Sequence, residues 1–382
     1  MEQIISFITE TGWHVLPFLF VLGIVVFVHE FGHFWVARRA GVKIETFSIG
    51  FGKEVCHWFD SKGTRWRVAW MPLGGYVKMF GDADPSSFGP DEAVKDFTDE
   101  EKKVAFYTQK LWKRFAIVAA GPGSNYLFAI VLLVLLYGLS GQPFTATEIS
   151  QVIENSAASR AGVEVGDRVL SIDGVPMESF ESIRRTIALN TGETIDILVD
   201  RGGIETHLTA TPDVEKQTDR LGGAHVTGKL GIVSTKSEVR ELGPLEAVRE
   251  AFKEVWSVTT GTLKGVGQMI MGTRGTEELG GPLRIAEMSG KVARDGIAAL
   301  VWFLVVISVN LGLINLFPIP LLDGGHLLFY IAEGLRGKPL SDNVQEYSAR
   351  VGMTIVVALM IFATWNDLVH FKLVSYVQGL FS

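Results

Sequence analysis

The feature that most constrains this fold is an apolar run that ends in a polar motif. Residues 15–28 carry no charge and lead directly into His29-Glu30-Phe31-Gly32-His33. An apolar stretch of this length can enter a bilayer as a helix. The two histidines would share one helical face, and this spacing around a glutamate is typical of zinc peptidases. Because ionisable groups at membrane depth are costly, we interpret the motif as a metal site.

The whole sequence has the balance of a membrane protein. Hydrophobic residues make up 47% of the chain, charged residues only 20%, and the mean hydropathy is +0.27. We predict a mainly α-helical, polytopic protein with about four transmembrane helices. The four apolar stretches are Trp13–Ala37, Ala116–Leu139, Ile297–Phe317 and Val351–Trp365, the last extending through Val369.

Lysine and arginine predict the orientation of these helices. They are frequent between the first two stretches and recur between the last two, so we place both loops in the cytosol. Both termini and the 141–295 segment would then be extracytoplasmic. The N-terminus lacks a basic region and a cleavage site, so we expect the first helix to remain in the mature protein. The net charge of −7 argues against a nucleic-acid partner, and the single cysteine excludes an intramolecular disulfide.

A third metal ligand is required, because catalytic zinc usually takes three protein ligands. The third apolar stretch ends in Asn315-Leu316-Phe317-Pro318-Ile319-Pro320-Leu321-Leu322-Asp323-Gly324-Gly325-His326. Two prolines this close break the helix, and the carboxylate of Asp323 follows the break. We favour Asp323 as the third ligand, although it could instead cap the next helix. His326 is a weaker candidate ligand, or a group that supports one.

The two motifs together identify a resemblance to a known family. HEFGH in the first membrane helix, paired with NLFPIPLLDGG in a later one, resembles the site-2 protease family of intramembrane zinc metalloproteases, in its bacterial RseP type. The resemblance covers nearly the whole chain. It implies zinc bound by His29, His33 and Asp323, with Glu30 as general base. It also implies that Asn315 positions the substrate or stabilises the oxyanion, and that Gly50 and Gly52 form the family's Gly-x-Gly.

Residues 64–80 predict a membrane-associated β-hairpin. Apolar and polar residues alternate around Pro72-Leu73-Gly74-Gly75, a typical turn sequence. Its Trp, Met and Phe residues favour insertion against the helices, and an exposed edge could hold an extended substrate near Gly74 and Gly75. An ordinary surface hairpin is the alternative. Residues 81–103 are polar and rich in turn residues, so we interpret them as a mobile cytosolic loop.

Residues 144–235 change character and predict a PDZ domain. Short β-rich runs alternate with glycine turns, and Glu181–Leu189 would be the helix beside the groove. The resemblance extends here to one PDZ domain of the bacterial protease kind. A PDZ groove binds chain ends by strand addition, and Leu230-Gly231-Ile232 is the candidate carboxylate-binding loop. The alternative is a rigid size filter that binds no C-terminus. Residues 245–272 predict an amphipathic helix after it.

These expectations define four segments and one function. The segments are 1–143 with HExxH, hairpin and loop, 144–235 as the PDZ domain, 236–295 as an amphipathic connector, and 296–382 with the second motif. We predict an intramembrane zinc endopeptidase of the bacterial inner membrane that cuts single-span membrane proteins, with its site near the cytosolic side. The alternatives are a membrane-anchored zinc peptidase acting on soluble or misfolded proteins, and a non-catalytic PDZ scaffold.

Overall fold

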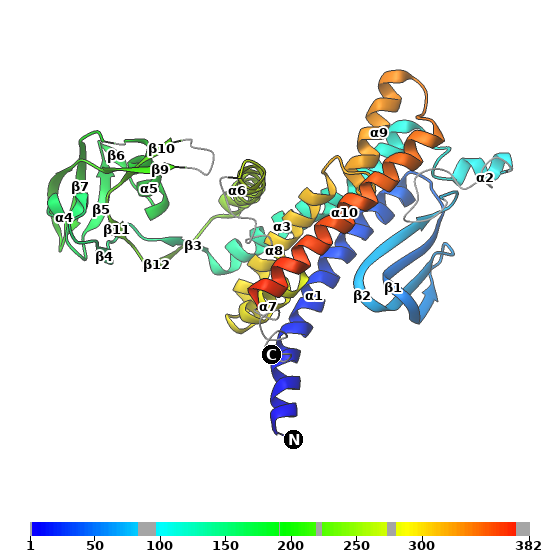
Figure 1. The fold of residues 1–382 in the computed structure, drawn as a ribbon, viewed down its shortest axis with the longest axis horizontal. Helices are drawn as coiled ribbons and strands as arrows, with labels where there is room; N and C mark the ends of the chain where they lie inside the picture. The colour runs from blue at the N-terminus through cyan, green and yellow to red at the C-terminus, as the bar shows by residue number, and fades with distance from the viewer. Residues whose placement is uncertain (1, 83–96, 191, 219–223, 273–279, 372–382) are drawn as a thin grey trace, which may run out of the picture. The chain divides into compact units, whose positions relative to one another are not determined.

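The computed structural model describes residues 2–82, 97–190, 192–218, 224–272 and 280–371. The chain divides into two compact units. The first combines residues 1–134, 248–263 and 276–382, and the second combines 135–247 and 264–275. Figure 1 shows the helices of the first unit and the strands of the second.

Four helices of the described residues are long and apolar enough to cross a membrane. They are α1 (Glu2–Arg39), α3 (Leu111–Ser140), α8 (Ile297–Asn315) and α10 (Asp342–His370). Helix α1 packs against α8 and against α7 (Pro282–Arg294) (Figure 1). Val21 and Val25 of α1 are buried in one cluster with Phe303 and Leu304 of α8. The predicted fold class, a polytopic helical protein with about four spans, is confirmed.

Further helices of the described residues lie outside these spans. They are α2 (Asp99–Val104), α6 (Pro244–Ile270) and α9 (Asp323–Arg336). Helix α6 corresponds to the amphipathic helix predicted over 245–272. Helix α2 corrects part of the loop predicted over 81–103, because Thr98 and Glu101 form a capping box that starts a helix there. Residues 83–96 of that loop lie outside the described residues.

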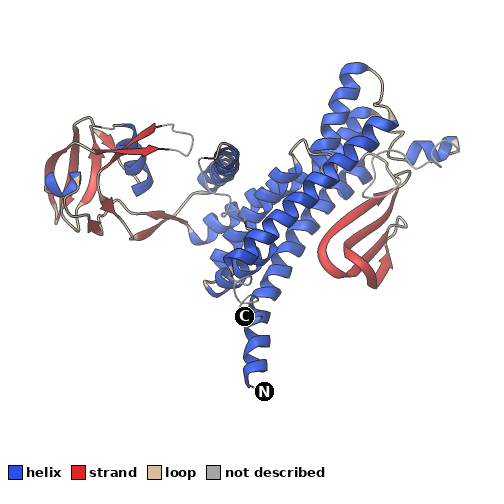
Figure 2. Ribbon diagram, in the orientation of Figure 1, coloured by secondary structure: helices blue, strands red, loops and turns tan. Residues whose placement is uncertain are grey.

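A β-hairpin is present, but it is not the one predicted over residues 64–80. Strands β1 (Ile44–Phe59) and β2 (Arg65–Met79) are joined at residues 60–64, and β2 runs through Gly74 and Gly75 (Figure 2). The carboxylate of Asp60 accepts the backbone N–H groups of Lys62 and Thr64, which closes the turn. Burial alone would raise the pKa of Asp60, but hydrogen bonds from Arg38 and Trp66 and from this turn lower it to about 2.

Both strands bend, so each contributes two segments to the sheet. The first half of β1 pairs with the end of β2 (Ile49 with Gly75, Ile44 with Met79) and also with its beginning (Phe47 with Trp66). The second half of β1 pairs with the beginning of β2 as well. This bending is why a hairpin confined to residues 64–80 was the wrong prediction: its two halves pair with β1, not with each other.

Aromatic contacts fix this sheet against the end of α1. The Phe47 ring lies 5.4 Å from Phe34 and 4.4 Å from Trp66, measured between ring centroids. The guanidinium of Arg38 stacks on Phe34 at 4.5 Å. Phe34 and Phe47 are buried. Because Phe34 follows His33 directly, this packing holds the sheet beside the histidine motif.

The second unit is an α+β module inserted between the second and third spans. Ile172, Ile183, Ile197 and Val199 are among its buried residues. A four-stranded sheet has the order β6-β5-β7-β8, and three strand pairs and two helices complete the module (Figure 2). The elements are β3 (Gln142–Thr145) with β12 (Ser237–Arg240), β4 (Gln151–Val152) with β11 (Ile232–Val233), β9 (Asp213–Thr218) with β10 (Ala224–Lys229), β5 (Arg168–Ile172), β6 (Val175–Pro176), β7 (Ile195–Arg201), β8 (Ile204–Ala210), α4 (Ala157–Arg160) and α5 (Phe180–Leu189).

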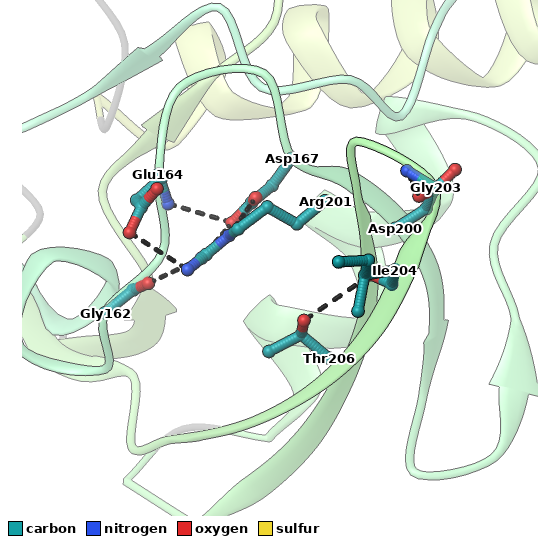
Figure 3. A network of polar contacts seen from close by, with 8 residues as sticks. All are labelled: Gly162, Glu164, Asp167, Asp200, Arg201, Gly203, Ile204 and Thr206. Carbon is teal, nitrogen blue, oxygen red and sulfur yellow. Dashed lines mark hydrogen bonds and ion pairs between the residues drawn. The ribbon is translucent and has the colours of Figure 1, made fainter.

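One buried carboxylate joins β5 and β7 to the preceding loop. Asp167 is 1% exposed and accepts two hydrogen bonds from Arg201, from Nε at 2.7 Å and from Nη2 at 2.8 Å (Figure 3). It also accepts the backbone N–H of Glu164. Arg201 further donates to the carbonyl of Gly162. A bidentate pair of this kind fixes the loop geometry more firmly than a single ion pair.

Candidate metal centre

The two histidines of α1 lie on one face of the helix and point to a common position. His29 and His33 are both buried. Their Nε2 atoms are 3.3 Å apart. This is the consequence of the four-residue spacing, because side chains one helical turn apart lie above one another.

Asp323 reaches the same position from the first turn of α9. Its Oδ2 lies 3.1 Å from His29 Nε2, and its Oδ1 lies 3.5 Å from His33 Nε2. The helix cap is Leu322, which makes no side-chain cap hydrogen bond, so Asp323 is not acting as the N-cap.

The broken segment before α9 permits this placement. Leu321 has a φ of +81°, a left-handed conformation that is strained for leucine. A Cβ at Gly324 would lie 2.2 Å from the carbonyl oxygen of Phe317, and one at Gly325 would lie 2.6 Å from that of Ile319. These glycines therefore let α9 start against the preceding segment, and bring Asp323 to α1.

The three ligand atoms fit a zinc ion. They lie within 4.8 Å of one another. Zinc with four ligands at about 2.0–2.2 Å has ligand-to-ligand distances of about 3.3–3.6 Å, close to the spacing of these atoms. Oδ2 of Asp323 is buried and has no hydrogen-bond partner. Two imidazoles and a carboxylate are a common catalytic zinc set, with the fourth position left for water.

Helix α3 forms the other wall of this centre. A Cβ at Gly121 would lie 2.2 Å from His33 Nε2 and 2.9 Å from His29 Cε1. The Nδ1 atoms of both histidines face α3: that of His33 lies 2.9 Å from the carbonyl of Ile117, and that of His29 lies 3.2 Å from Nδ2 of Asn125. Sequence reasoning missed Gly121 and Asn125. The signal was Gly121-Pro122-Gly123-Ser124-Asn125, a polar interruption within an apolar span.

A cavity of about 680 Å³ adjoins the metal ligands. Glu30 lines it beside His29 and His33, and Asn315 lines it from the end of α8. His326 also lines it but is not part of the metal-ligand cluster. The lining of the cavity therefore combines the three candidate ligands, a carboxylate able to move a proton, and an amide able to donate a hydrogen bond.

The predicted substrate-binding glycines divide into two groups. Gly75 lines the cavity, and a Cβ there would lie 3.2 Å from Cγ of Glu30. Gly74 contacts the ring of Phe51, which itself lines the cavity. Gly50 and Gly52 flank Phe51 in β1, with φ values of +88° and +87°, but neither lines the cavity. They are placed where β1 bends.

The candidate loop of the second unit lies in a groove beside α5. Leu230, Gly231 and Ile232 line this groove together with Phe180 and Ile187 of α5. A Cβ at Gly231 would lie 2.2 Å from Cβ of Ser156, and its φ is +83°. Gly231 is therefore required for the loop to pass this close to Ser156.

Comparisons with known proteins match the chain over most of its length. Residues 17–359 match peptidase family M50. A protein of Agrobacterium fabrum whose name describes a zinc metalloprotease is 43% identical, covering 94% of this chain and 96% of the relative. Metalloprotease MmpA of Caulobacter vibrioides is 34% identical, covering 96% and 98%. Regulator of sigma-E protease RseP of Salmonella typhimurium is 32% identical, covering 93% and 98%. A PDZ domain of an SdrC-like protein from Listeria innocua is 20% identical, covering 25% of this chain and 99% of that domain, with a TM-score of 0.20.

Proposed function

The chain belongs to peptidase family M50, the site-2 protease family, and is a zinc metalloprotease; from this premise we propose that it cleaves single-span membrane proteins within their transmembrane segments. The observation that carries the proposal is the location of the metal-ligand cluster. His29 and His33 belong to a helix apolar enough to span a membrane, and Asp323 follows a second such helix. A site built between membrane helices favours substrates that reach it through the bilayer.

The residues around the cluster support a hydrolytic mechanism. His29, His33 and Asp323 would hold zinc, which when bound supplies a Lewis acid that activates water and polarises the scissile carbonyl. Glu30 would take a proton from the attacking water onto its carboxylate and return it to the leaving amine. Asn315 would orient the substrate carbonyl or stabilise its developing negative charge by donating from its amide.

Strand β2 offers the extended backbone that peptide cleavage needs. Tyr76, Val77, Lys78 and Met79 line the cavity, and β1 covers one side of this segment. Among the described residues the sheet consists of β1 and β2, so the other side of the segment carries no paired strand. We propose that a locally unwound substrate adds to this edge, which places its backbone near Glu30.

The groove of the second unit has the charge to receive a chain end. Arg184 and Arg185 of α5 line it with Lys229, against a single acidic residue, Glu181. We propose that it binds a free C-terminus at the Leu230–Ile232 loop, with a preference for acidic residues. A labelled acidic peptide should bind the full-length protein at least about tenfold more tightly than its C-terminal amide. Equal binding would favour the size-filter alternative.

The proposed activity is tested with the Glu30→Gln variant. The wild-type protein and the variant are purified in detergent and given a single-span reporter whose outer domain has been removed. We expect both proteins to contain zinc and only the wild type to cut the reporter. Cleavage at an unchanged rate by Glu30→Gln would refute the role of Glu30.

A soluble unfolded protein serves as the second substrate in the same assay. The proposed function predicts that it is cut far more slowly than the membrane reporter. Preferential cleavage of the soluble protein would favour the alternative, a membrane-anchored peptidase of misfolded proteins. Cleavage of neither substrate, with zinc bound, would favour the scaffold.

The location follows from the same premise. We propose that the protein lies in the bacterial inner membrane, with the metal centre towards the cytosol and the PDZ module and both termini outside. The support is the basic composition of the loops that precede α3 and follow α9, because positive charges are retained in the cytosol.

A further inference from the structure

Asn125 of α3 is a buried polar residue with no role in the proposed mechanism. It is 0% exposed, and its amide faces Nδ1 of His29 at 3.2 Å. Its Oδ1 is buried without a hydrogen-bond partner. Burying an amide inside a membrane helix is unfavourable unless its hydrogen bonds are used. The position of Asn125 beside a metal ligand therefore calls for an explanation.

The neighbouring histidine shows what a metal site needs here. The carbonyl of Ile117 can only accept a hydrogen bond, so Nδ1 of His33, 2.9 Å away, must carry the proton. The lone pair of His33 then lies on Nε2, which faces Asp323. His29 also turns Nε2 towards Asp323. It needs the same tautomer, and therefore an acceptor for its own Nδ1–H.

We propose that Asn125 is the positioning residue for His29, accepting Nδ1–H with its side-chain Oδ1 so that Nε2 is free for zinc. Half a turn of the amide about its last torsion exchanges Oδ1 and Nδ2, which have nearly the same shape. This inference rests on the proposed metal site and adds to it a partner from α3. A neutral amide supplies the acceptor without placing another negative charge beside Glu30 and Asp323.

The surroundings of Asn125 hold its backbone in place. Oγ of Ser308 on α8 donates to the carbonyl of Asn125 at 2.9 Å. Oγ of the preceding Ser124 donates to the carbonyl of Val28 on α1 at 2.7 Å, directly before His29. A Cβ at Gly32 would lie 2.3 Å from the carbonyl oxygen of Ala120, so α1 and α3 are in close contact here. Contacts from α1 and α8 thus fix the backbone of Asn125 relative to the imidazole of His29.

The test measures zinc affinity in detergent by competition with a chromophoric chelator. Asn125→Leu keeps the approximate shape but removes the acceptor, and should weaken zinc binding by about 10–100-fold. Asn125→Asp restores an acceptor and should bind zinc at least as tightly as the wild type. Rescue by aspartate is not expected of a residue that only fills space. Asn310→Leu is the matched control, because it makes the same change at an asparagine of α8 whose Oδ1 accepts a hydrogen bond from Oγ1 of Thr262. It should stay within about threefold of the wild type.

Two outcomes overturn the inference and one overturns its premise. Wild-type affinity in Asn125→Leu, while His29→Ala loses zinc, would show that Asn125 does not position the ligand. At least tenfold weaker binding in Asn125→Asp would contradict the acceptor role even if Asn125→Leu fails to fold. Unchanged zinc affinity in both His29→Ala and Asp323→Ala would instead refute the proposed metal site.

Discussion

At the scale of single residues, the centre depends on a glycine as much as on its ligands. A methyl group at Gly121 would lie within 3 Å of both imidazoles. We predict that Gly121→Ala displaces His33 and His29 and lowers zinc affinity at least tenfold. Gly123→Ala on the same helix is the control, because its Cβ would meet no atom within 4 Å. Chelator competition on both variants measures the difference, and equal zinc affinity would contradict the geometry.

The proposed ligands could be found from the sequence, but the residues around them could not. His29, Glu30 and His33 carry their chemistry in residue type and spacing, and Asp323 follows a proline break that can be recognised. Gly121 and Asn125 acquire their roles only because α3 crosses α1 at Gly32. Nothing in the order of residues fixes that crossing, since small residues permit close contact without specifying a partner.

At the scale of elements, the turn of the β-hairpin shows how local signals can mislead. Pro72-Leu73-Gly74-Gly75 has turn composition, yet β2 continues through Gly74 and Gly75. Residues 60–64 form the actual turn: the Asp60 carboxylate accepts the N–H groups of Lys62 and Thr64, and the backbone carbonyl of Asp60 accepts that of Gly63. The glycines of β2 serve close packing instead, against Phe51 and Glu30. Turn propensity is local, whereas strand pairing is decided by the whole sheet.

Helix α10 is joined to α7 by one buried carboxylate. Asp367 is 0% exposed and accepts the N–H groups of Gly281, Leu283 and Arg284 at the start of α7. Asp367→Ala leaves these donors without an acceptor and should destabilise the protein by about 2–4 kcal/mol. Asp367→Asn keeps one acceptor oxygen and should therefore lose less stability than Asp367→Ala. Thermal unfolding in detergent compares them, with Glu346→Ala on the exposed part of α10 as control. Equal midpoints in all three variants would contradict this role.

The second unit should lose stability in acid through Asp167. Burial raises the pKa of this carboxyl, but hydrogen bonds from Arg201 and Glu164 outweigh that effect and lower it. Its contribution is therefore complete above the unfolded pKa of about 3.9 and disappears as the pH falls through the lower folded value. We expect Asp167→Ala to cost roughly 1–3 kcal/mol at pH 7 and progressively less in acid.

Scanning calorimetry of the full-length protein from pH 7 down to about pH 2 measures this dependence, because the loss falls below the unfolded pKa. Asp200→Ala, which removes only a hydrogen bond to the N–H of Gly203 in a neighbouring turn, is the control. This control variant should lower the free energy of unfolding by at most about 1 kcal/mol. A cost of Asp167→Ala that stays the same down to the lowest pH would contradict the contribution of the ionised carboxylate.

At the scale of the whole molecule, the single cysteine reports the orientation in the membrane. Cys56 is exposed on β1, in the segment that the positive-inside rule assigns to the cytosol. A membrane-impermeant maleimide should label it in inverted vesicles and not in intact spheroplasts. The double variant Cys56→Ser/Glu205→Cys moves the thiol to β8 of the second unit and should show the opposite pattern. Labelling of Cys56 from outside would reverse the proposed topology.

The position of the scissile bond tests intramembrane hydrolysis at this centre most directly. The full-length protein is reconstituted in liposomes with a single-span substrate, and the products are sequenced by mass spectrometry. We expect a cut inside the transmembrane segment, in its cytosolic half, that is absent with Glu30→Gln. A cut confined to the soluble part of the substrate, or one that persists with Glu30→Gln, would contradict intramembrane hydrolysis at this centre.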